Sequence, residues 1–376
     1  MLRRATAVAL IVIVPLTGGG AAVAQAHRTA AAHLLQGQAQ LQAKKKPQPK
    51  AITLDGAGAN SIDPFFESVF YAYHQANPKV TINYDPAGSS VGVTDVQENT
   101  VDFGDSEIPM AAKDLAKAKG TVLQVPVDLG GVAISYNIPG VATGLKLDGP
   151  TLAAIYDGAI NNWDDPAIAA VTGDSKLPNL KIVPVHRADT SGPGWDLDDY
   201  LIETAPKWVA SIGTSKPSKA WPITFIGVGE QLNSGVATYI SQTPGAIGYV
   251  EYGYALKANF TNAAVLNSEG IYQAPSQATI AQAGKTATKL SATNFSIINQ
   301  PGYGVYPLAN FSWTLLYQKQ ANTAKGEALQ ALFNYVVTTG QSEAAQLGYA
   351  PLPANVVVLA QSTLKQLETS SGKPLP

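Results

Sequence analysis

The fold class is decided by residues 51–75, AITLDGAGANSIDPFFESVFYAYHQ, which hold a strand, a glycine turn and a helix. The apolar start predicts a strand over residues 51–54, which ends at the glycines of residues 56–58. A helix is expected over residues 63–75, because aromatic and apolar residues recur there every three or four positions.

The same succession of strand, turn and helix recurs along the chain. A second strand is predicted over residues 80–84, followed by Gly88-Ser89-Ser90 and a helix over residues 91–98. Repeated succession of this kind is typical of an α/β sheet with right-handed crossovers. Further strands are expected at 101–104, 130–136, 182–185, 245–250 and 313–317, and further helices at 151–156, 195–203 and 326–339.

Composition narrows the class of protein. The 376 residues suffice for two domains, and 45% hydrophobic with 14% charged residues is a globular composition. The chain has no cysteine, which excludes disulfides, thiolate metal sites, cysteine nucleophiles and a lipid-modified cysteine. With four histidines, a multi-histidine metal site is hard to build. We therefore expect no metal and no cofactor.

The first 50 residues have the features of an export signal and a tether. Arg3 and Arg4 precede an apolar run, and Ala24-Gln25-Ala26 has the small-x-small pattern of a cleavage site. Residues 1–26 are thus predicted to be a signal peptide, as opposed to an uncut membrane anchor. Residues 27–50, rich in Ala, Gln and Lys, are predicted to be a flexible tether. The protein is expected in the periplasm or at the cell envelope, without a lipid anchor.

Net charge argues against nucleic acid as a partner. Seven of the 25 basic residues and none of the 27 acidic residues precede Ala51, so residues 51–376 carry 18 against 27, a net charge of −9. Binding to a phosphate backbone requires a basic face, which this balance does not favour.

Three predicted turns between a strand and a helix combine small residues with hydroxyl groups. They are residues 56–61 (GAGANS), 88–90 (GSS) and 187–192 (RADTSG). Unpaired N–H groups and the positive dipole end favour an anion at a helix N-terminus. Ordinary N-capping is the alternative for any one turn, but three turns at the carboxyl ends of strands favour a shared anion site.

Arg187 strengthens this hypothesis. It is the single arginine of residues 51–376, in which every other cation is lysine. A planar guanidinium binds an oxyanion through two parallel hydrogen bonds, and Asp189 is placed to orient it. A surface salt bridge is the alternative interpretation.

Two other motifs suggest different functions. Residues 88–92 match the G-x-S-x-G nucleophile elbow of α/β hydrolases, which would make Ser90 a nucleophile with His186 as its base. An exported esterase or phosphatase using Ser90 or Ser191 thus remains an alternative. Neither a complete dinucleotide fingerprint nor a G-K-[ST] loop occurs. Trp163-Asp164-Asp165 and the tyrosines of residues 249–254 are interpreted as core and surface residues.

Over most of residues 52–376 the chain resembles the periplasmic phosphate-binding protein of the high-affinity phosphate ABC transporter. The resemblance includes the segments GAGA (56–59), GSS (88–90), TVDFG (100–104), NWDD (162–165), RAD (187–189), PGAIGYVEY (244–252) and SGKPL (371–375). It implies a type II periplasmic-binding-protein fold of two α/β lobes with a ligand cleft between them. One lobe would comprise residues 51–128 and 304–376, and the other residues 129–303.

The resemblance also implies a set of phosphate contacts. The ligand-binding residues would be Asn60, Ser61, Ser89, Glu107, Arg187, Ser191 and Gly192, supported by Gly58, Gly88, Ser90, Asp189 and Pro193. Three positions depart from the family pattern. Asn60-Ser61 replaces a hydroxyl residue followed by an aromatic residue, Glu107 replaces aspartate, and Pro193 replaces threonine. The amide of Asn60 is expected to replace the missing donor.

The resemblance implies a binding protein without catalytic residues. Inorganic phosphate would be the ligand, permease subunits of an ABC transporter the partner, and the protein a monomer. Glu107 is expected to accept the proton that phosphate keeps at neutral pH and to repel sulfate, which has none. A diverged member that binds another oxyanion, or serves as an envelope interaction protein, is the second alternative.

Overall fold

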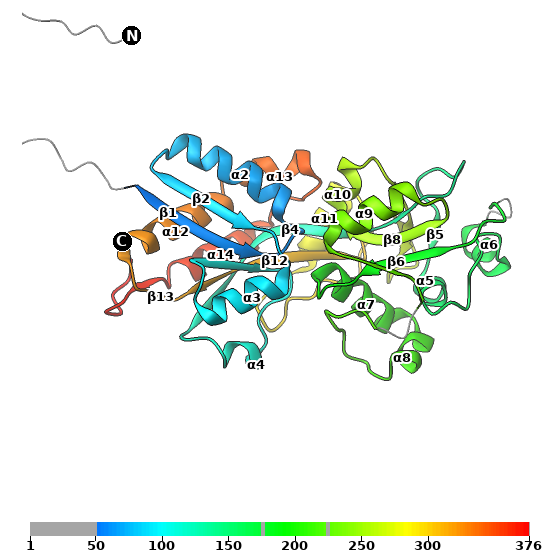
Figure 1. Cartoon of the computed structure of the whole chain (residues 1–376), viewed down its shortest axis with the longest axis horizontal. Helices are drawn as coiled ribbons and strands as arrows, with labels where there is room; N and C mark the ends of the chain where they lie inside the picture. Colours follow the sequence, from blue (N-terminus) through cyan, green and yellow to red (C-terminus); the bar gives the residue numbers. More distant parts are fainter. Residues whose placement is uncertain (1–50, 174–176, 223–225, 376) are drawn as a thin grey trace, which may run out of the picture. The chain divides into compact units, whose positions relative to one another are not determined.

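The computed structural model describes residues 51–173, 177–222 and 226–375 (Figure 1). The predicted signal peptide and tether, residues 1–50, lie outside the described residues. Strands and helices alternate over much of the described chain, as predicted for an α/β protein. In the large mixed sheet, hydrogen-bonded neighbours follow the order β2 (Val80–Asp85), β1 (Ile52–Gly58), β3 (Phe103–Ser106), β12 (Ala309–Tyr317), β4 (Val122–Tyr136), β8 (Ala246–Glu251), β6 (Val183–Arg187) and β7 (Val228–Glu230), and β9 (Thr261–Asn262) also pairs with β4.

One end of this sheet consists of parallel strands. Strand β1 pairs with β2 and β3, and the connecting helices are α2 (Asp63–Ala76) and α3 (Ser89–Glu98). Phe65, Phe66, Val69 and Phe70 of α2 are buried in the core, at the spacing that predicted the helix. We call these three strands, with α2, α3 and α4 (Ala112–Leu115), the β1 side.

Strand β4 connects the β1 side to the rest of the sheet, because its two parts pair with different strands. Residues 122–131 pair with antiparallel β12, and residues 132–136 pair with antiparallel β8. The strand begins eight residues before the predicted start at Gly130. Pro126 lies next to the register shift at Ser312 and Trp313, a bulge that admits a proline within a paired strand.

The other end of the sheet is again parallel. Strand β6 lies between β8 and β7 and is parallel to both. Helix α9 (Leu232–Gln242) packs on it through Val236 and Ile240, which contact Val185 and Val250 in a buried cluster. We call β6, β7 and β8, with α7 (Gly192–Thr204), α9 and α10 (Tyr252–Lys257), the β8 side. The β1 side and the β8 side are named from strand pairing alone. The predicted boundaries of the two lobes stay a prediction.

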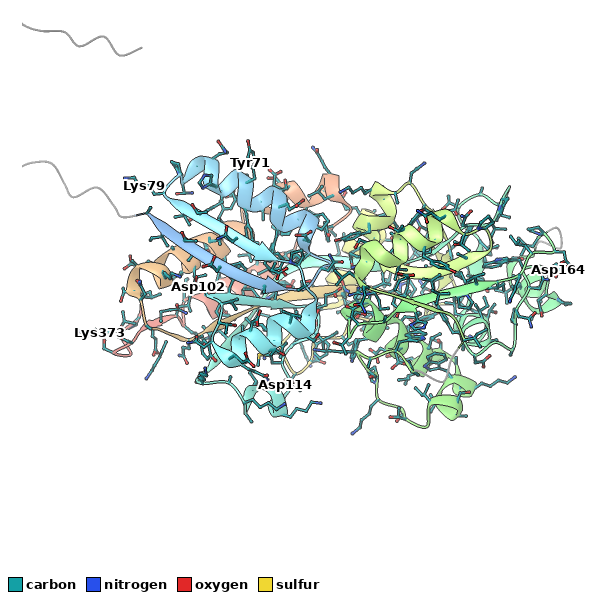
Figure 2. The ribbon with its side chains drawn as sticks, in the orientation of Figure 1. Tyr71, Lys79, Asp102, Asp114, Asp164 and Lys373 are labelled. Carbon is teal, nitrogen blue, oxygen red and sulfur yellow. The ribbon has the colours of Figure 1, made fainter. Side chains whose placement is uncertain are left out.

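The remaining described elements cover the edges and faces of the sheet. Charged side chains such as Lys79, Asp164 and Lys373 are exposed at the periphery (Figure 2). These elements are β5 (Lys146–Leu147), α5 (Gly149–Tyr156), α6 (Pro166–Thr172), α8 (Pro206–Ile212), β10 (Ala264–Leu266), β11 (Tyr272–Gln273), α11 (Gln277–Thr286), β13 (Lys319–Gln320), α12 (Thr323–Val336), α13 (Gln341–Ala344), the 3-10 helix Ala345–Leu347, α14 (Ala354–Leu364) and β14 (Glu368–Thr369).

The segments predicted as strands and helices are observed with shifted ends. The strand predicted over residues 101–104 is β3, Phe103–Ser106, because Val101 and Asp102 still belong to the preceding turn. The helix predicted from residue 195 is α7, which begins three residues earlier at Gly192. Its first turn contains Gly192 and Pro193, residues that disfavour a helix interior but are tolerated at its start.

Candidate functional site

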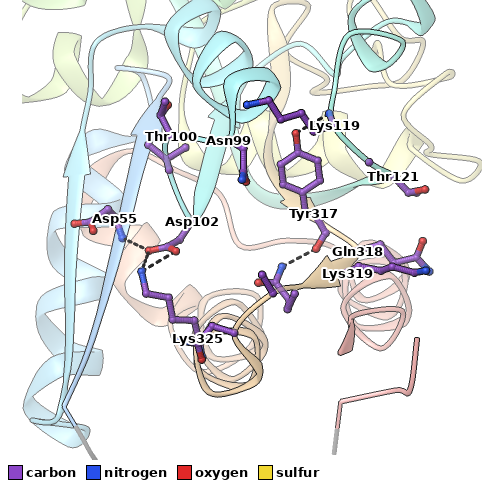
Figure 3. Close-up of a pocket in the computed structure, with 15 residues that line it drawn as sticks. Asp55, Asn99, Thr100, Asp102, Lys119, Thr121, Tyr317, Gln318, Lys319 and Lys325 are labelled. Atoms are coloured by element: carbon purple, nitrogen blue, oxygen red, sulfur yellow. Dashed lines mark hydrogen bonds and ion pairs between the residues drawn. The ribbon is translucent and has the colours of Figure 1, made fainter. Parts of the chain in front are cut away.

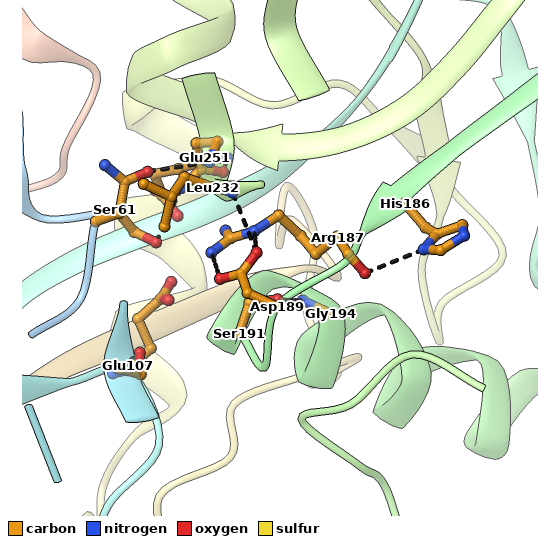
Figure 4. Close-up of polar contacts among 12 residues, drawn as sticks. Ser61, Glu107, His186, Arg187, Asp189, Ser191, Gly194, Leu232 and Glu251 are labelled. Atoms are coloured by element: carbon orange, nitrogen blue, oxygen red, sulfur yellow. Dashed lines mark hydrogen bonds and ion pairs between the residues drawn. The ribbon is translucent and has the colours of Figure 1, made fainter. Parts of the chain in front are cut away.

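The predicted ligand-binding residues lie where strands of the two sides end. Asn60 and Ser61 follow β1, Ser89 follows β2, Glu107 follows β3, and Arg187 ends β6. The fold thus places side chains from both sides at the centre of the molecule, where Figure 4 shows Ser61, Glu107, Arg187 and Ser191. All are buried despite their polarity, with exposed fractions of 6% for Asn60, 3% for Ser61, 2% for Ser89, 3% for Glu107, 2% for Arg187 and 1% for Ser191.

The guanidinium of Arg187 is held in place by Asp189. Its Nε atom donates to Oδ1 of Asp189 at 2.7 Å, and Nη2 donates to Oδ2 (Figure 4). Burial alone would raise the pKa of Asp189, but the hydrogen bonds and the charge of Arg187 outweigh burial and lower that pKa. Among the described residues Nη1 has no hydrogen-bond partner, although it is buried. A buried cationic donor of this kind is suited to an anionic ligand.

Two helix N-termini lie near the Arg187–Asp189 pair: Ser191 follows Asp189 in the same turn, and a Cβ on Gly88 would lie 3.5 Å from Oδ2 of Asp189. Helix α3 begins at Ser89 after Gly88, whose φ of 111° suits glycine. Helix α7 begins at Gly192 after Ser191, whose Oγ accepts from the N–H of Gly194 at 3.1 Å. The hydroxyl of Ser191 therefore caps the N-terminus of α7. Ordinary N-capping was the alternative interpretation of this turn. The hydroxyl of Ser89 accepts weakly from the N–H of Glu107, at 3.4 Å.

The supporting residues shape the turns. A Cβ on Gly58 would lie 2.2 Å from the carbonyl oxygen of Asp105, so no side chain fits there. The N–H of Gly88 donates to the carbonyl of Gly58 at 2.7 Å and ties the first two turns together. Ser90 is half-buried in the first turn of α3, and Pro193 is buried in the first turn of α7. Proline offers no N–H, so Pro193 contributes no backbone donor.

The carboxyl group of Glu107 is packed against the start of α7. A Cβ on Gly192 would lie 2.2 Å from Oε2 and 2.4 Å from Cβ of Glu107, so the glutamate fills the space that any larger residue would need. Burial raises the pKa of Glu107 to about 7, although a hydrogen bond with Ser61 and the charges of Arg187 and Lys219 lower it. Near neutral pH this carboxyl group can exist in both protonation states.

Four further buried carboxyl groups surround Glu107, and no motif in the sequence predicted them. The side-chain amide of Asn310 bridges two of the acids: Nδ2 donates to Oδ2 of Asp196 at 2.5 Å and to Oε1 of Glu107 at 3.3 Å. Burial is also the main cause of the raised pKa of each of the four. We infer that these groups stay protonated where an ordinary carboxyl group is ionised. They are Asp105, Asp128, Asp196 and Glu251.

The structure changes the role expected of Asn60. Its Nδ2 donates to the hydroxyl of Tyr254 at 2.9 Å, and its Oδ1 accepts from the N–H of Asn233 at 3.0 Å. The amide is therefore engaged by protein groups through Oδ1 and one hydrogen of Nδ2, and its role as a donor to the ligand stays a prediction. The interpretation of residues 249–254 as core and surface was also incomplete, because the hydroxyl of Tyr249 accepts a hydrogen bond from the N–H of Arg187 at 3.0 Å.

A hydrolase site is not formed around His186. Its Nδ1 lies 3.0 Å from the carbonyl oxygen of Arg187, and its ring stacks on Trp221 (Figure 4 shows the former contact). Within the described ranges, no hydrogen bond joins His186 to Ser90 or Ser191. The nucleophile-elbow motif thus lacks the base that it would need.

A larger cavity lies elsewhere in the described part of the chain. It has a volume of about 610 Å³ and opens where β3 and β4 begin and β12 ends (Figure 3). Asp102 and Lys325 form an ion pair in its wall, and the ring of Tyr317 also lines it. None of the predicted ligand-binding residues lines this cavity. In contrast, Glu107, Asp196 and Asn310 line a cavity of only about 10 Å³, so little space is left between these three side chains.

Two features are absent from the described part of the chain. No helix there is long and apolar enough to cross a membrane. Nor do the described His, Asp and Glu side chains form a group of three or more that could hold a metal ion.

Comparison with known proteins gives consistent matches. A family model described as a PBP superfamily domain matches residues 26–339. A phosphate-binding protein PstS of Xylella fastidiosa is 34% identical over 313 residues, which cover 82% of this chain and 84% of that protein. The PstS of Pasteurella multocida is 34% identical over 87% of this chain and 94% of that protein. The PstS 3 of Mycobacterium tuberculosis is 30% identical over 351 residues, which cover 90% of this chain and 88% of that protein.

Solved structures match the fold. The structure of a high-affinity periplasmic phosphate-binding protein with bound phosphate, PfluDING, has a TM-score of 0.67 at 18% identity, covering 83% of this chain and 93% of that chain. A phosphate-binding protein from Stenotrophomonas maltophilia has a TM-score of 0.65 at 18% identity, covering 83% of this chain and 94% of that chain. These matches confirm the predicted fold class.

Proposed function

Because the chain belongs to the PBP superfamily, and within it to the family of PstS phosphate-binding proteins, we propose that it captures inorganic phosphate outside the cytoplasm and delivers it to an ABC transporter. The family consists of substrate-binding proteins. The observation that carries the proposal for this chain is the buried Nη1 atom of Arg187, which has no partner among the described residues while Asp189 fixes the rest of the guanidinium.

Phosphate would lie between the two sides of the sheet. Arg187 supplies the positive charge and at least one donor from the β8 side, together with the N-terminus of α7 at Gly192. From the β1 side, the N-terminus of α3 at Ser89 supplies N–H groups that are free of intrahelical partners. Hydrogen bonds and helix N-termini would bind the ligand at short range in a buried site. Their attraction outweighs the repulsion between the ligand and the distant negative charges of the protein.

Glu107 would set the selectivity between tetrahedral anions. Phosphate keeps a proton near neutral pH and can donate it to the carboxylate of Glu107, whereas fully ionised sulfate would meet that carboxylate with like charge. Arsenate carries a proton in the same way and is expected to compete with phosphate. The support for this role is the burial of Glu107 beside Ser61 and the start of α7.

The proposal also covers the partner protein, the oligomeric state and the absence of a catalysed reaction. The partner is the permease of the transporter, the protein acts as a monomer, and no chemical step is involved. The lack of cysteine supports export without a lipid anchor, because the usual lipid attachment at a leader's end needs that residue.

The proposal is tested by isothermal titration of the purified full chain, first dialysed against phosphate-free denaturant and refolded, with phosphate, arsenate and sulfate. Tight binding of phosphate and arsenate, with sulfate at least about 100-fold weaker, is the expected result. Equal affinity for sulfate would remove the selectivity role of Glu107. Failure to bind phosphate at all would refute the proposed function.

A further inference from the structure

A dipeptide at the start of α9, Leu232-Asn233, joins the residues of the candidate site from both sides. The N–H of Leu232 donates to Oδ1 of Asp189 at 3.1 Å. The next N–H, that of Asn233, donates to Oδ1 of Asn60 at 3.0 Å. Two consecutive N–H groups therefore hold the orienting partner of Arg187 and a residue of the opposite side.

The backbone of this dipeptide is unusual. Leu232 has a φ of 60°, the left-handed conformation that bulky side chains rarely adopt. Such a conformation persists only where surrounding contacts stabilise it, and it tends to occur at functional sites. Here the hydrogen bonds to Asp189 and Asn60 supply these contacts, together with the packing of α9 on β6 and β8.

The side chain of Asn233 is fully buried and uses both ends of its amide. Its Nδ2 donates to Oγ of Ser61 at 3.2 Å, across to the β1 side. Its Oδ1 accepts from the N–H of Glu251 at 2.9 Å, within the β8 side. With an exposed fraction of 0%, Asn233 cannot exchange these partners for water while the two sides stay together.

Tyr254 makes a second set of bonds to the same turn. Its hydroxyl accepts from Nδ2 of Asn60 at 2.9 Å and lies 3.0 Å from the carbonyl oxygen of Asn60, to which it can donate. Asn233 and Tyr254 are both on the β8 side, and both bind the turn that follows β1. We call Asn60, Ser61, Asn233 and Tyr254 the clasp.

We infer that the clasp holds the two sides of the sheet closed over the ligand, with Asn233 and Tyr254 as positioning residues that act through Asn60 and Ser61. The inference rests on the proposed function, because it assigns a role in retaining phosphate. The clasp bonds join protein to protein, so they stabilise the closed state without contributing to the first encounter with the ligand. Losing them should speed release and should not slow capture.

The test measures phosphate association and dissociation rates by stopped-flow tryptophan fluorescence. Asn233→Ala and Tyr254→Phe are each expected to raise the dissociation rate about tenfold, the effect of one net hydrogen bond, while the association rate does not fall. A merely structural role would lower thermal stability without this selective change in one rate.

Matched controls remove similar bonds away from the clasp. Asn267→Ala deletes a buried amide that bonds the backbone of Val305, Glu269 and Ile271. Tyr200→Phe deletes a hydroxyl that donates to the carbonyl of Leu266. Both controls are expected to leave the two rates unchanged. Clasp variants whose dissociation rates match the controls would overturn the inference, as would a slower association rate at an unchanged dissociation rate.

A second measurement works without ligand. The chain has no native cysteine, so spin labels can be attached at Lys113→Cys on α4 and at Lys216→Cys in the segment between α8 and β7, both at exposed positions. The distance distribution between the labels should shift to longer values in Asn233→Ala. An unchanged distribution would contradict the clasp, even if the wild-type protein bound no phosphate and the proposed function had failed.

Discussion

Arg187, which is buried, and Asp189, which is half-buried, form a pair in which two guanidinium nitrogens donate to the two carboxylate oxygens, while Nη1 is left without a partner among the described residues. Because the pair is two residues apart on one turn, the guanidinium plane is set before any ligand arrives. The free nitrogen then marks where an anion would bind.

Removal of the guanidinium should therefore weaken phosphate binding strongly. We expect Arg187→Ala to reduce affinity about 100-fold and Arg187→Lys about tenfold, because a hydrogen bond to a charged group contributes about 1.5–3 kcal/mol. Lysine keeps the charge and loses the planar fork. Titration calorimetry measures both. Lys325→Ala, which removes a cation paired with Asp102, is the control and should bind phosphate normally. Wild-type affinity in Arg187→Ala would disprove the assignment.

Neutralising Glu107 should relax selectivity. In Glu107→Gln the side chain keeps its size and gains an amide donor, so sulfate no longer meets a carboxylate. We expect sulfate affinity to rise at least about tenfold while phosphate affinity changes less. Glu343→Gln, which alters a carboxylate bonded to Ser68 away from the site, is the matched control. Competition of sulfate against labelled phosphate checks the prediction, and an unchanged ratio of affinities would contradict it.

Selectivity should also depend on pH. Burial raises the pKa of Glu107 to about 7, so below pH 7 its carboxyl group is mostly protonated and can donate to sulfate. Sulfate affinity should thus increase as the pH falls from 8 to 6, by up to about tenfold per pH unit for one linked proton. Charged or titratable groups facing Glu107 are Arg187, Lys219, Asp105, Asp128, Asp196 and Glu251.

This pH effect is measured by titrating sulfate at pH 6, 7 and 8. Sulfate keeps the same charge over this range, so any change reports on the protein. The slope should disappear in Glu107→Gln. A slope that persists in this variant would assign the proton to another of the buried acids.

The buried acids should make the fold more stable in mild acid. The pKa values of Asp105, Asp128, Asp196 and Glu251 are raised by burial, so the folded state binds more protons than the unfolded state above about pH 4. The free energy of unfolding therefore falls as the pH rises towards the folded-state pKa values, by about 1.4 kcal/mol per pH unit for each acid that stays protonated.

Urea unfolding at pH 5 and pH 8 tests this expectation. The free energy of unfolding should be larger at pH 5, and Asp128→Asn should reduce the difference between the two values. Asp164→Asn, at an exposed position, should leave it unchanged. A protein that is more stable at pH 8 would show that these acids are ionised when folded.

The contact between Gly192 and Glu107 should tolerate no added atom. In Gly192→Ala the new Cβ would lie within 2.4 Å of three atoms of Glu107, including its Cβ, so the whole side chain has to move. We expect phosphate affinity to fall at least about tenfold, because site geometry on this scale matters. In the control Gly120→Ala the nearest atom is 3.5 Å away, in the ring of Tyr317, and binding should be unaffected. Normal binding by Gly192→Ala would show that Glu107 is not fixed by α7.

Local pattern predicted much of the fold. The apolar period of residues 63–75 predicted helix α2, and the turn at Gly88 predicted the end of β2. The predicted end of the first strand before Gly56 was wrong, because β1 continues through Gly56 to Gly58. The early part of β4 was missed, because Pro126 fits within this paired strand beside a bulge, where Val127 of β4 has no partner in the register with β12. Helix α9 was also missed, since its first residue, Leu232, adopts a left-handed conformation that sequence does not signal.

The sequence by itself determined the α/β pattern, the three turns with small and hydroxyl residues, and the single arginine at the end of a strand, because spacing and residue type are local properties. Only the tertiary structure decided which partners those residues have. Asn60 is engaged by Asn233 and Tyr254, 173 and 194 residues away, and Glu107 lies among acids that include Asp128, Asp196 and Glu251 from three other segments. Burial, which raises the pKa of Glu107, arises when both sides of the sheet close around it, and no single segment contains that information.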